Sequence, residues 1–118
     1  MKLGVFGGAF DPPHLGHLKA ARFFAEALCL DELLIVPAAH SPRKGAPFAC
    51  DEARLQLCRL TFPFPVSEIE IARGGESYTA DTLRDLRAGG GASAAPAAAL
   101  FLLIGTDQLR QFTRWHAW

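Results

Sequence analysis

Short apolar runs alternate with amphipathic stretches along this chain. Residues 3–6, 33–36 and 100–104 are the apolar runs, and each is followed by glycine or proline. Short runs of this kind are typical of strands that are buried on both faces of a parallel sheet. Residues 66–71 alternate around Glu68 and Glu70 instead. That alternation predicts a strand nearer an exposed edge, with both glutamates facing water.

The amphipathic stretches predict helices between these strands. In residues 17–28 and 51–60 apolar side chains recur at helical spacing. A third helix should contain Leu83 and Leu86 and end before the glycines at 89–91, and a further helix should begin at Asp107. The predicted buried positions are Leu18, Ala21, Phe24, Ala25 and Leu28 in the first helix, and Ala53, Leu57, Cys58 and Leu60 in the second.

Strands that alternate with helices predict an α/β fold, with a Rossmann-like, mostly parallel sheet and helices on both faces. Such sheets bind ligands beyond the carboxyl ends of their strands. The rule selects four loops, at residues 7–17, 37–44, 72–79 and 105–107. With 118 residues, the chain is the size of a single domain.

Composition narrows the class of protein. Twelve basic residues balance twelve acidic ones, so no global field attracts polyanions and a nucleic-acid partner is disfavoured. The longest apolar run, residues 97–104, is far shorter than the roughly 20 residues of a membrane-spanning helix. No signal peptide is visible, so we expect a cytoplasmic protein without a membrane partner. Cys29, Cys50 and Cys58 lack metal-site spacing and are expected to be reduced, mostly buried thiols.

Residues 7–17, with the sequence GGAFDPPHLGH, hold the strongest candidate chemistry. Here the chain leaves a buried strand and enters a helix, where backbone N–H groups favour an anion. Gly7 and Gly8 let a phosphate approach, while His14 and His17 face one point across Gly16. Two alternatives stay open at this stage. One is a capped helix with two structural histidines, and the other is a metal site formed by Asp11, His14 and His17.

This segment resembles the G-G-x-F-D-P-x-H-x-G-H signature of the nucleotidylyltransferase superfamily. Within it, residues 77–83 (SYTADTL), 105–107 (GTD) and Trp115 resemble the nicotinate mononucleotide adenylyltransferases. The resemblance implies that the phosphates of ATP lie on Gly7, Gly8, Ala9, Phe10, Asp11, His14, Gly16 and His17. It implies that the mononucleotide lies on Ser77, Tyr78, Thr79, Gly105, Asp107 and Trp115. Ser77 and Asp107 as simple helix caps, with Trp115 as a core aromatic residue, are the alternatives.

Residues 40–44 (HSPRK) lie where the family commonly has P-P-H-K. Serine replaces a proline and arginine replaces the histidine, whereas Lys44 is retained. We expect Lys44, with Arg43, to neutralise triphosphate charge, although a solvated loop would have a similar sequence. His40 is expected to be structural. Whether Arg43 replaces the family's histidine in function stays open.

The resemblance implies transfer of the adenylyl group of ATP to nicotinate mononucleotide, giving deamido-NAD and pyrophosphate. His14, His17 and Lys44 would be the catalytic residues, and Mg²⁺ would accompany ATP. Alternatives are an adenylyltransferase acting on nicotinamide mononucleotide or phosphopantetheine, and a non-catalytic nucleotide-binding fragment. The oligomeric state stays open, with a homo-oligomer as one option.

Family members continue to an I-S-x-T-x-x-R motif that helps to bind ATP, whereas this sequence ends at Trp118 without that motif. The resemblance therefore implies that residues 1–118 are the N-terminal part of the family's nucleotidylyltransferase domain, with the C-terminal portion missing. On that basis we expect the chain alone to bind the mononucleotide and to be a poor catalyst.

Overall fold

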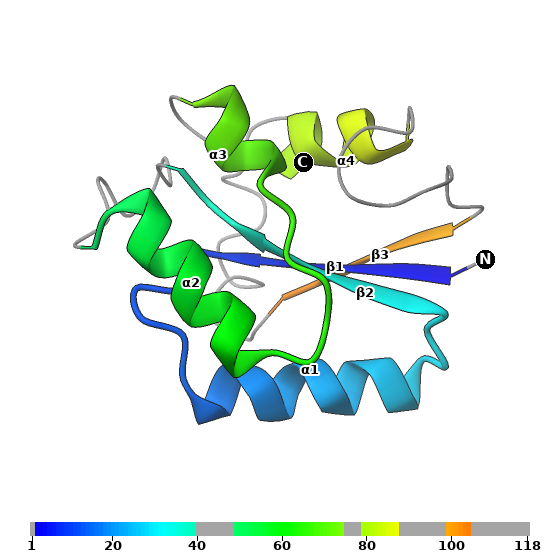
Figure 1. The fold of residues 1–118 in the computed structure, drawn as a ribbon. Coiled ribbons are helices and arrows are strands. Elements are labelled where there is room, and N and C mark those ends of the chain that lie inside the picture. Colours follow the sequence, from blue (N-terminus) through cyan, green and yellow to red (C-terminus); the bar gives the residue numbers. More distant parts are fainter. Residues whose placement is uncertain (1, 40–48, 75–78, 88–98, 105–118) are drawn as a thin grey trace.

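A computed structural model describes residues 2–39, 49–74, 79–87 and 99–104 (Figure 1). Its centre is a parallel sheet of β1 (Lys2–Gly8), β2 (Glu32–Pro37) and β3 (Ala99–Leu103), in the order β2-β1-β3. β1 is the middle strand, with Val5 opposite Leu34 on one side and opposite Leu102 on the other. The parallel α/β sheet expected from the apolar runs is therefore confirmed.

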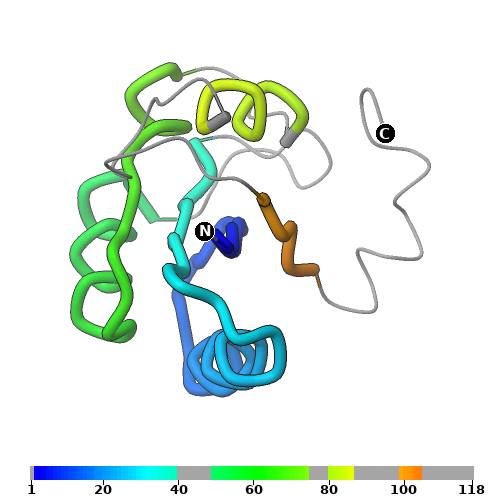
Figure 2. Tube along the Cα trace, turned by 90° about the vertical axis from the view of Figure 1, so that its right-hand side faces the viewer, coloured from blue at the N-terminus to red at the C-terminus, as the bar shows by residue number. Residues whose placement is uncertain are grey.

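Helices cover both faces of this sheet, as Figure 2 shows in a view turned by 90°. α1 (Leu15–Ala27) and α2 (Asp51–Thr61) pack on one face. α3 (Ile69–Arg73) and α4 (Thr79–Arg87) pack on the other. The helices expected within residues 17–28 and 51–60 and around Leu83 are confirmed. The helix expected from Asp107 lies outside the described residues.

Two apolar clusters hold these layers together, because successive side chains of a strand point to opposite faces. Under α1 and α2 lies a cluster that includes Phe6, Ile35 and Ala21. Leu3, Val5 and Leu34 point the other way, toward Leu86 of α4. All five predicted core positions of α1 belong to the first cluster, with Ala21 buried and the other four partly buried. That helix face was thus correctly predicted.

The strand expected over residues 66–71 is largely wrong. Val66 forms a single parallel bridge with Ile35, beyond the edge of β2, and α3 begins three residues later. The Ser67 hydroxyl accepts the backbone N–H of Ile69 at 3.2 Å, a local bond that turns the chain out of the extended conformation. Glu68 is exposed as expected, but Glu70 is buried instead of facing water.

The buried face of α2 also differs from the expected one. Leu57 and Leu60 are exposed, whereas Arg54, Leu55 and Cys58 are buried. Of the four predicted positions, Cys58 is buried and Ala53 is partly buried, so the prediction is wrong at Leu57 and Leu60 only. Choosing apolar residues alone also missed a buried position that is occupied by arginine.

The expectation that the cysteines are mostly buried is wrong as well. Cys29 and Cys50 are exposed, and Cys58 alone of the three is buried. None of the three forms a disulfide in the structure, and their reduced state stays a prediction.

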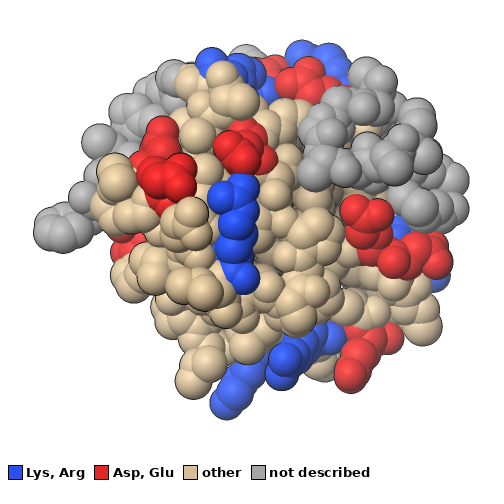
Figure 3. Space-filling view, in the orientation of Figure 1, with Lys and Arg blue, Asp and Glu red and all other residues tan. Residues whose placement is uncertain are grey.

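Acidic and basic side chains are interspersed on the face drawn in Figure 3 and do not form a patch of one sign. Oppositely charged side chains pair in the described part of the chain, as in the contact of Arg59 with Glu68 at 2.8 Å. Among the described helices, none is long and apolar enough to cross a membrane.

Candidate functional site

The candidate site begins where β1 ends. Gly8 is the last residue of β1 and lies opposite Pro37, the last residue of β2. One residue further on, the N–H of Ala38 donates to the carbonyl of Gly8 at 2.8 Å. The carboxyl ends of both strands thus lie at the same edge of the sheet, which is where parallel α/β folds bind their ligands. From this edge residues 9–14 lead directly into α1.

His14 and His17 form a stacked pair at the start of α1. Their ring centroids are 3.7 Å apart and their planes differ by 19°. His14 is the N-cap residue of α1, and its Nδ1 accepts the N–H of Gly16 at 3.1 Å. The Nδ1 of His17 accepts the N–H of His14, also at 3.1 Å. The two rings therefore cap the helix reciprocally, in the manner of a capping box.

These bonds determine which tautomer each neutral ring adopts. A neutral imidazole has one acceptor nitrogen and one N–H donor. Because Nδ1 accepts a backbone N–H in both histidines, the ring proton lies on Nε2 in both. An Nε2–H group is a hydrogen-bond donor, and donors are what an anionic ligand requires. Structural capping of α1 therefore uses Nδ1 of both rings and does not involve Nε2, so it does not exclude a second role for the pair.

The glycines of this segment differ in what the fold requires of them. A Cβ on Gly16 would lie 3.0 Å from the His14 ring, so a side chain there would push the stacked histidine out of its position. On Gly8 a Cβ would meet the Phe10 ring at 3.4 Å, and on Gly7 it would meet the Val36 carbonyl at 3.6 Å. Both are ordinary van der Waals distances. Packing within the described fold therefore does not explain why Gly7 and Gly8 lack side chains.

The Phe10 side chain packs against the ring of His17. Phe10 is a non-glycine residue in the left-handed region, with φ +47°, a conformation that costs about 1 to 2 kcal/mol. Its ring is 3% exposed and makes edge contacts with Phe6, His17 and Phe62 at centroid distances of 5.6, 5.1 and 5.5 Å. This packing holds both the strained backbone and one edge of the His17 ring.

Arg54 is the residue at this edge that sequence reasoning missed. Its side chain is fully buried, and its guanidinium donates to the Ala9 carbonyl at 2.9 Å and to the Ala38 carbonyl. The Asp11 carboxylate lies nearby in the same structure and accepts the N–H of Ala49 at 2.9 Å. The available signal was the position of this arginine in the first turn of α2, between the acidic residues that begin the helix and Leu55. Because arginine is usually exposed, this signal is weak.

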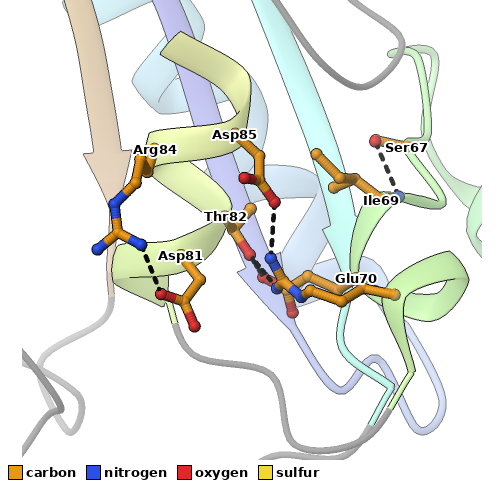
Figure 4. A network of polar contacts seen from close by, with 8 residues as sticks. Ser67, Ile69, Glu70, Asp81, Thr82, Arg84 and Asp85 are labelled. Atoms are coloured by element: carbon orange, nitrogen blue, oxygen red, sulfur yellow. Dashed lines mark hydrogen bonds and ion pairs between the residues drawn. The ribbon is translucent and has the colours of Figure 1, made fainter. Parts of the chain in front are cut away.

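A second polar cluster joins α3 to α4 on the opposite face of the sheet (Figure 4). The buried Thr82 hydroxyl donates to the Glu70 carboxylate and accepts from Arg73 at 2.8 Å. Arg73 also pairs with Asp85 at 2.9 Å. The cluster fixes the orientation of α4, whose first residue is Thr79.

Not every predicted site residue can be placed. Gly7, Gly8, Ala9, Phe10, Asp11, His14, Gly16 and His17 all lie between the end of β1 and the first turn of α1. Thr79 begins α4. The remaining predicted residues lie outside the described ranges, namely His40, Arg43, Lys44, Ser77, Tyr78, Gly105, Asp107 and Trp115.

The alternative metal site concerns three residues that the structure describes, Asp11, His14 and His17. Within the described ranges, no three His, Cys, Asp or Glu side chains are grouped so that they could hold a metal ion. Asp11, His14 and His17 do not form such a group, and the Nδ1 atoms of both histidines already accept backbone N–H groups.

Comparison with known proteins shows the family to which this chain belongs. The model of the cytidylyltransferase-like family matches residues 5–118, and the chain belongs to that family. The curated relatives have a more specific description than this family. The chain is 45% identical over 120 residues to a probable nicotinate-nucleotide adenylyltransferase of Gemmatimonas aurantiaca, covering 98% of this chain and 54% of that protein.

Two further relatives have the same description. A probable nicotinate-nucleotide adenylyltransferase of Thermus thermophilus is 44% identical over 119 residues, covering 98% of this chain and 61% of that protein. Another, from Pseudomonas syringae pv. tomato, is 40% identical over 121 residues, covering 99% and 53%. The chain is thus a homologue of these enzymes and spans little more than half of their length.

Proposed function

We propose that this chain carries the catalytic edge of a nicotinate-nucleotide adenylyltransferase, which transfers the adenylyl group of ATP to nicotinate mononucleotide. The products are deamido-NAD and pyrophosphate, a step of NAD biosynthesis. The observation that carries the proposal is the stacked His14–His17 pair, with both ring protons on Nε2, beside two glycines whose Cβ positions meet the described residues only at ordinary distances. The relatives' descriptions support the choice of substrate.

The reaction is a single in-line displacement. An oxygen of the mononucleotide 5′-phosphate attacks the α-phosphorus of ATP, a P–O bond forms, and the bond to the β-phosphate bridging oxygen breaks as pyrophosphate leaves. No proton has to be removed from the attacking phosphate oxygen, so positioning and charge neutralisation dominate catalysis. The Nε2–H groups of His14 and His17 stabilise the charge that develops on the transferring phosphate. Gly7 and Gly8 admit that phosphate close to the backbone.

Outside the described ranges, the proposal assigns roles by resemblance. Lys44 and Arg43 neutralise the triphosphate. Ser77, Tyr78 and Thr79 bind the pyridine carboxylate with backbone N–H groups, and the Trp115 ring stacks on the pyridinium. Gly105 and Asp107 contact the mononucleotide. Mg²⁺ enters with ATP as part of the substrate complex, bound through phosphate oxygens in the usual way for this ion.

Mass spectrometry of the reaction products tests this function. The protein is incubated with MgATP and, separately, with nicotinate mononucleotide, nicotinamide mononucleotide and phosphopantetheine. We expect deamido-NAD as the main product, with kcat/KM at least tenfold higher for the acid than for the amide. The reason is that N–H donors aimed at a carboxylate face the NH₂ of an amide, and an unpaired buried donor costs about 1 to 3 kcal/mol. Equal kcat/KM for acid and amide would contradict the substrate assignment, and ATP binding without any transfer would favour a nucleotide-binding fragment.

A further inference from the structure

Arg54 is a fully buried charge on α2, and its contacts are almost all with the main chain. The guanidinium donates to the carbonyls of Ala9 at 2.9 Å, Ala38 and Ala49 at 3.3 Å. Its fourth partner is Asp51, one turn earlier on α2, at 2.7 Å. The Asp51 side chain is 52% exposed, so this ion pair is only partly removed from water.

The three carbonyls belong to three different segments at the carboxyl edge of the sheet. Ala9 follows Gly7 and Gly8, Ala38 follows β2, and Ala49 precedes α2. In the sequence, Ala38 and Ala49 are the two flanks of the segment that contains Arg43 and Lys44. One side chain thus ties the glycine turn to both flanks of the other segment predicted to bind phosphate.

A second set of bonds reinforces this connection. The N–H of Ala49 donates to the Asp11 carboxylate at 2.9 Å, and the N–H of Ala38 donates to the Gly8 carbonyl at 2.8 Å. Ala38 is therefore bound through its N–H group to the last residue of β1 and Ala49 to Asp11 in the segment that follows, and both are bound through their carbonyls to Arg54. The peptide group before each alanine and the peptide group after it are therefore both held in place.

Stability alone gives little reason for such a residue. A buried charge has a large desolvation cost, and replacement of buried ion pairs by apolar side chains is often neutral or stabilising. What a guanidinium does and an apolar residue cannot do is bind several carbonyl oxygens in one plane. By binding these oxygens it holds the three peptides in one orientation, and a carbonyl that turned toward a phosphate would repel it.

We propose that Arg54 is a positioning residue for the triphosphate: it sets the orientation of the glycine turn relative to the flanks of residues 39–48. The proposal rests on the proposed function, because it presumes that ATP binds at this edge. Arg54 itself touches neither substrate. It acts through the peptides of Ala9, Ala38 and Ala49.

The test compares Arg54→Lys with Arg59→Lys on the same helix. Lysine keeps the charge but has one ammonium group, which cannot reach all three carbonyls. Arg59 is exposed and pairs with Glu68, away from these segments, so its replacement controls for an Arg-to-Lys change on α2. For Arg54→Lys we expect the KM and the Kd for MgATP to rise at least tenfold, with the KM for nicotinate mononucleotide within about twofold of the unsubstituted protein. Arg59→Lys should change none of these values.

Amide hydrogen exchange supplies a readout that does not depend on activity. In Arg54→Lys we expect exchange at the Ala49 N–H to become at least tenfold faster, while the N–H of Ile35, bonded to the Pro65 carbonyl in the core, keeps its rate. Faster exchange at both amides, with lower kcat and unchanged KM for ATP, would identify a purely structural residue and overturn the proposal.

The outcomes also separate this proposal from the proposed function. If the unsubstituted protein binds MgATP but transfers nothing, the function fails and the Kd ratio still decides the role of Arg54. A Kd for MgATP in Arg54→Lys that equals the value in Arg59→Lys overturns the positioning role even if adenylyl transfer is intact. If the unsubstituted protein binds no ATP, both proposals fail.

Discussion

In the proposed function, His14 and His17 combine two tasks that sequence reasoning treats as alternatives, namely capping of α1 and phosphate binding. Each ring accepts a backbone N–H at Nδ1 and so stabilises the first turn of α1. The same bond directs the ring proton to Nε2, the nitrogen assigned to the phosphate. Replacement by alanine removes both tasks at once and cannot tell them apart. Asparagine can, because its side-chain oxygen takes a place close to that of Nδ1.

We therefore expect His17→Asn and His17→Ala to differ in stability but not in activity. Asparagine can still accept the N–H of His14, so its urea midpoint should stay above that of the alanine variant. Both variants lack Nε2–H, and kcat should fall about 10²-fold or more in each, the scale for one lost charge-stabilising donor. Urea denaturation and steady-state kinetics measure the two quantities. Normal turnover in His17→Asn would remove His17 from the catalytic assignment.

Substitution of Gly8 should have the converse effect, weaker MgATP binding without a loss of stability. Its Cβ position has ordinary contact with the Phe10 ring, and alanine is usually better tolerated than glycine within a strand. Gly8→Ala should change the free energy of unfolding by no more than about 1 kcal/mol. The added methyl group should weaken MgATP binding at least tenfold by calorimetry, because it occupies space assigned to phosphate.

Gly74→Ala is the matched opposite case. Gly74 has φ +73°, and no atom of the described residues lies within 4 Å of its Cβ position, so alanine there is strained but obstructs none of them. We expect it to lower the free energy of unfolding by about 1 to 3 kcal/mol, because this combination of φ and ψ is essentially restricted to glycine, and to leave the affinity for MgATP unchanged. Equal effects of the two substitutions on ATP binding would contradict the role given to Gly8.

At the scale of elements, the cluster of α3 and α4 explains the main error of the sequence interpretation. Alternation around Glu68 and Glu70 indicated a strand, because each glutamate was assigned to solvent. Glu70 instead points into the molecule, where Thr82 donates to it. Its partner is 12 residues away, on an element that a local pattern does not include. A buried carboxylate needs such a partner, and the tertiary contact overrides the local preference.

The Thr82 hydroxyl is the centre of this cluster, and its loss should destabilise the protein more than the loss of another threonine hydroxyl. Thr82→Val keeps the shape but removes one donor to Glu70 and one acceptor from Arg73. We expect the free energy of unfolding to fall by about 1 to 3 kcal/mol, the cost of buried groups that lose a bond.

Thr61→Val is the control for this prediction. Its hydroxyl donates to the Leu57 carbonyl within α2 at 2.7 Å, a site that water can reach. We expect a loss below about 1 kcal/mol there, because water replaces the bond. Urea denaturation of both variants measures the difference. Equal losses would mean that the cluster does not stabilise the packing of α3 on α4.

For the whole molecule, the periodicity of apolar residues predicted the layers of the fold well, but it did not predict which polar residues are buried. The apolar runs at 3–6 and 33–36 identified β1 and β2, because strands buried on both faces leave a signal within a few residues. The motif from Gly7 to His17 could likewise be found from the sequence, since its residues are contiguous. Arg54 could not be found this way. Its importance comes from Ala9, Ala38 and Ala49, which are distant in the sequence and contribute only carbonyl groups that no side-chain pattern reveals.

Cys58 provides a measure of the stability of the whole fold. Its thiol is fully buried in the cluster between α2 and the sheet, whereas Cys29 and Cys50 are exposed. We expect a thiol reagent to modify two cysteines rapidly at pH 8. Cys58 should react only as fast as the fold opens, and its reaction rate should rise in urea. Three equally reactive cysteines would contradict the packing of α2 on the sheet.

The same thiol makes stability depend on pH in the alkaline range. Burial raises the pKa of Cys58 from 9.0 to about 11, and the nearby charges of Arg54 and Arg59 oppose this rise only in part. The neutral thiol is favoured in the folded state, so its contribution is complete below pH 9.0 and is lost as the pH rises through about 11. The full loss amounts to about 3 kcal/mol. Urea denaturation from pH 8 to 11 should show this decline in the unsubstituted protein and a smaller one in Cys58→Ala. Equal declines in the two proteins would show that other groups, and not this thiol, control alkaline stability.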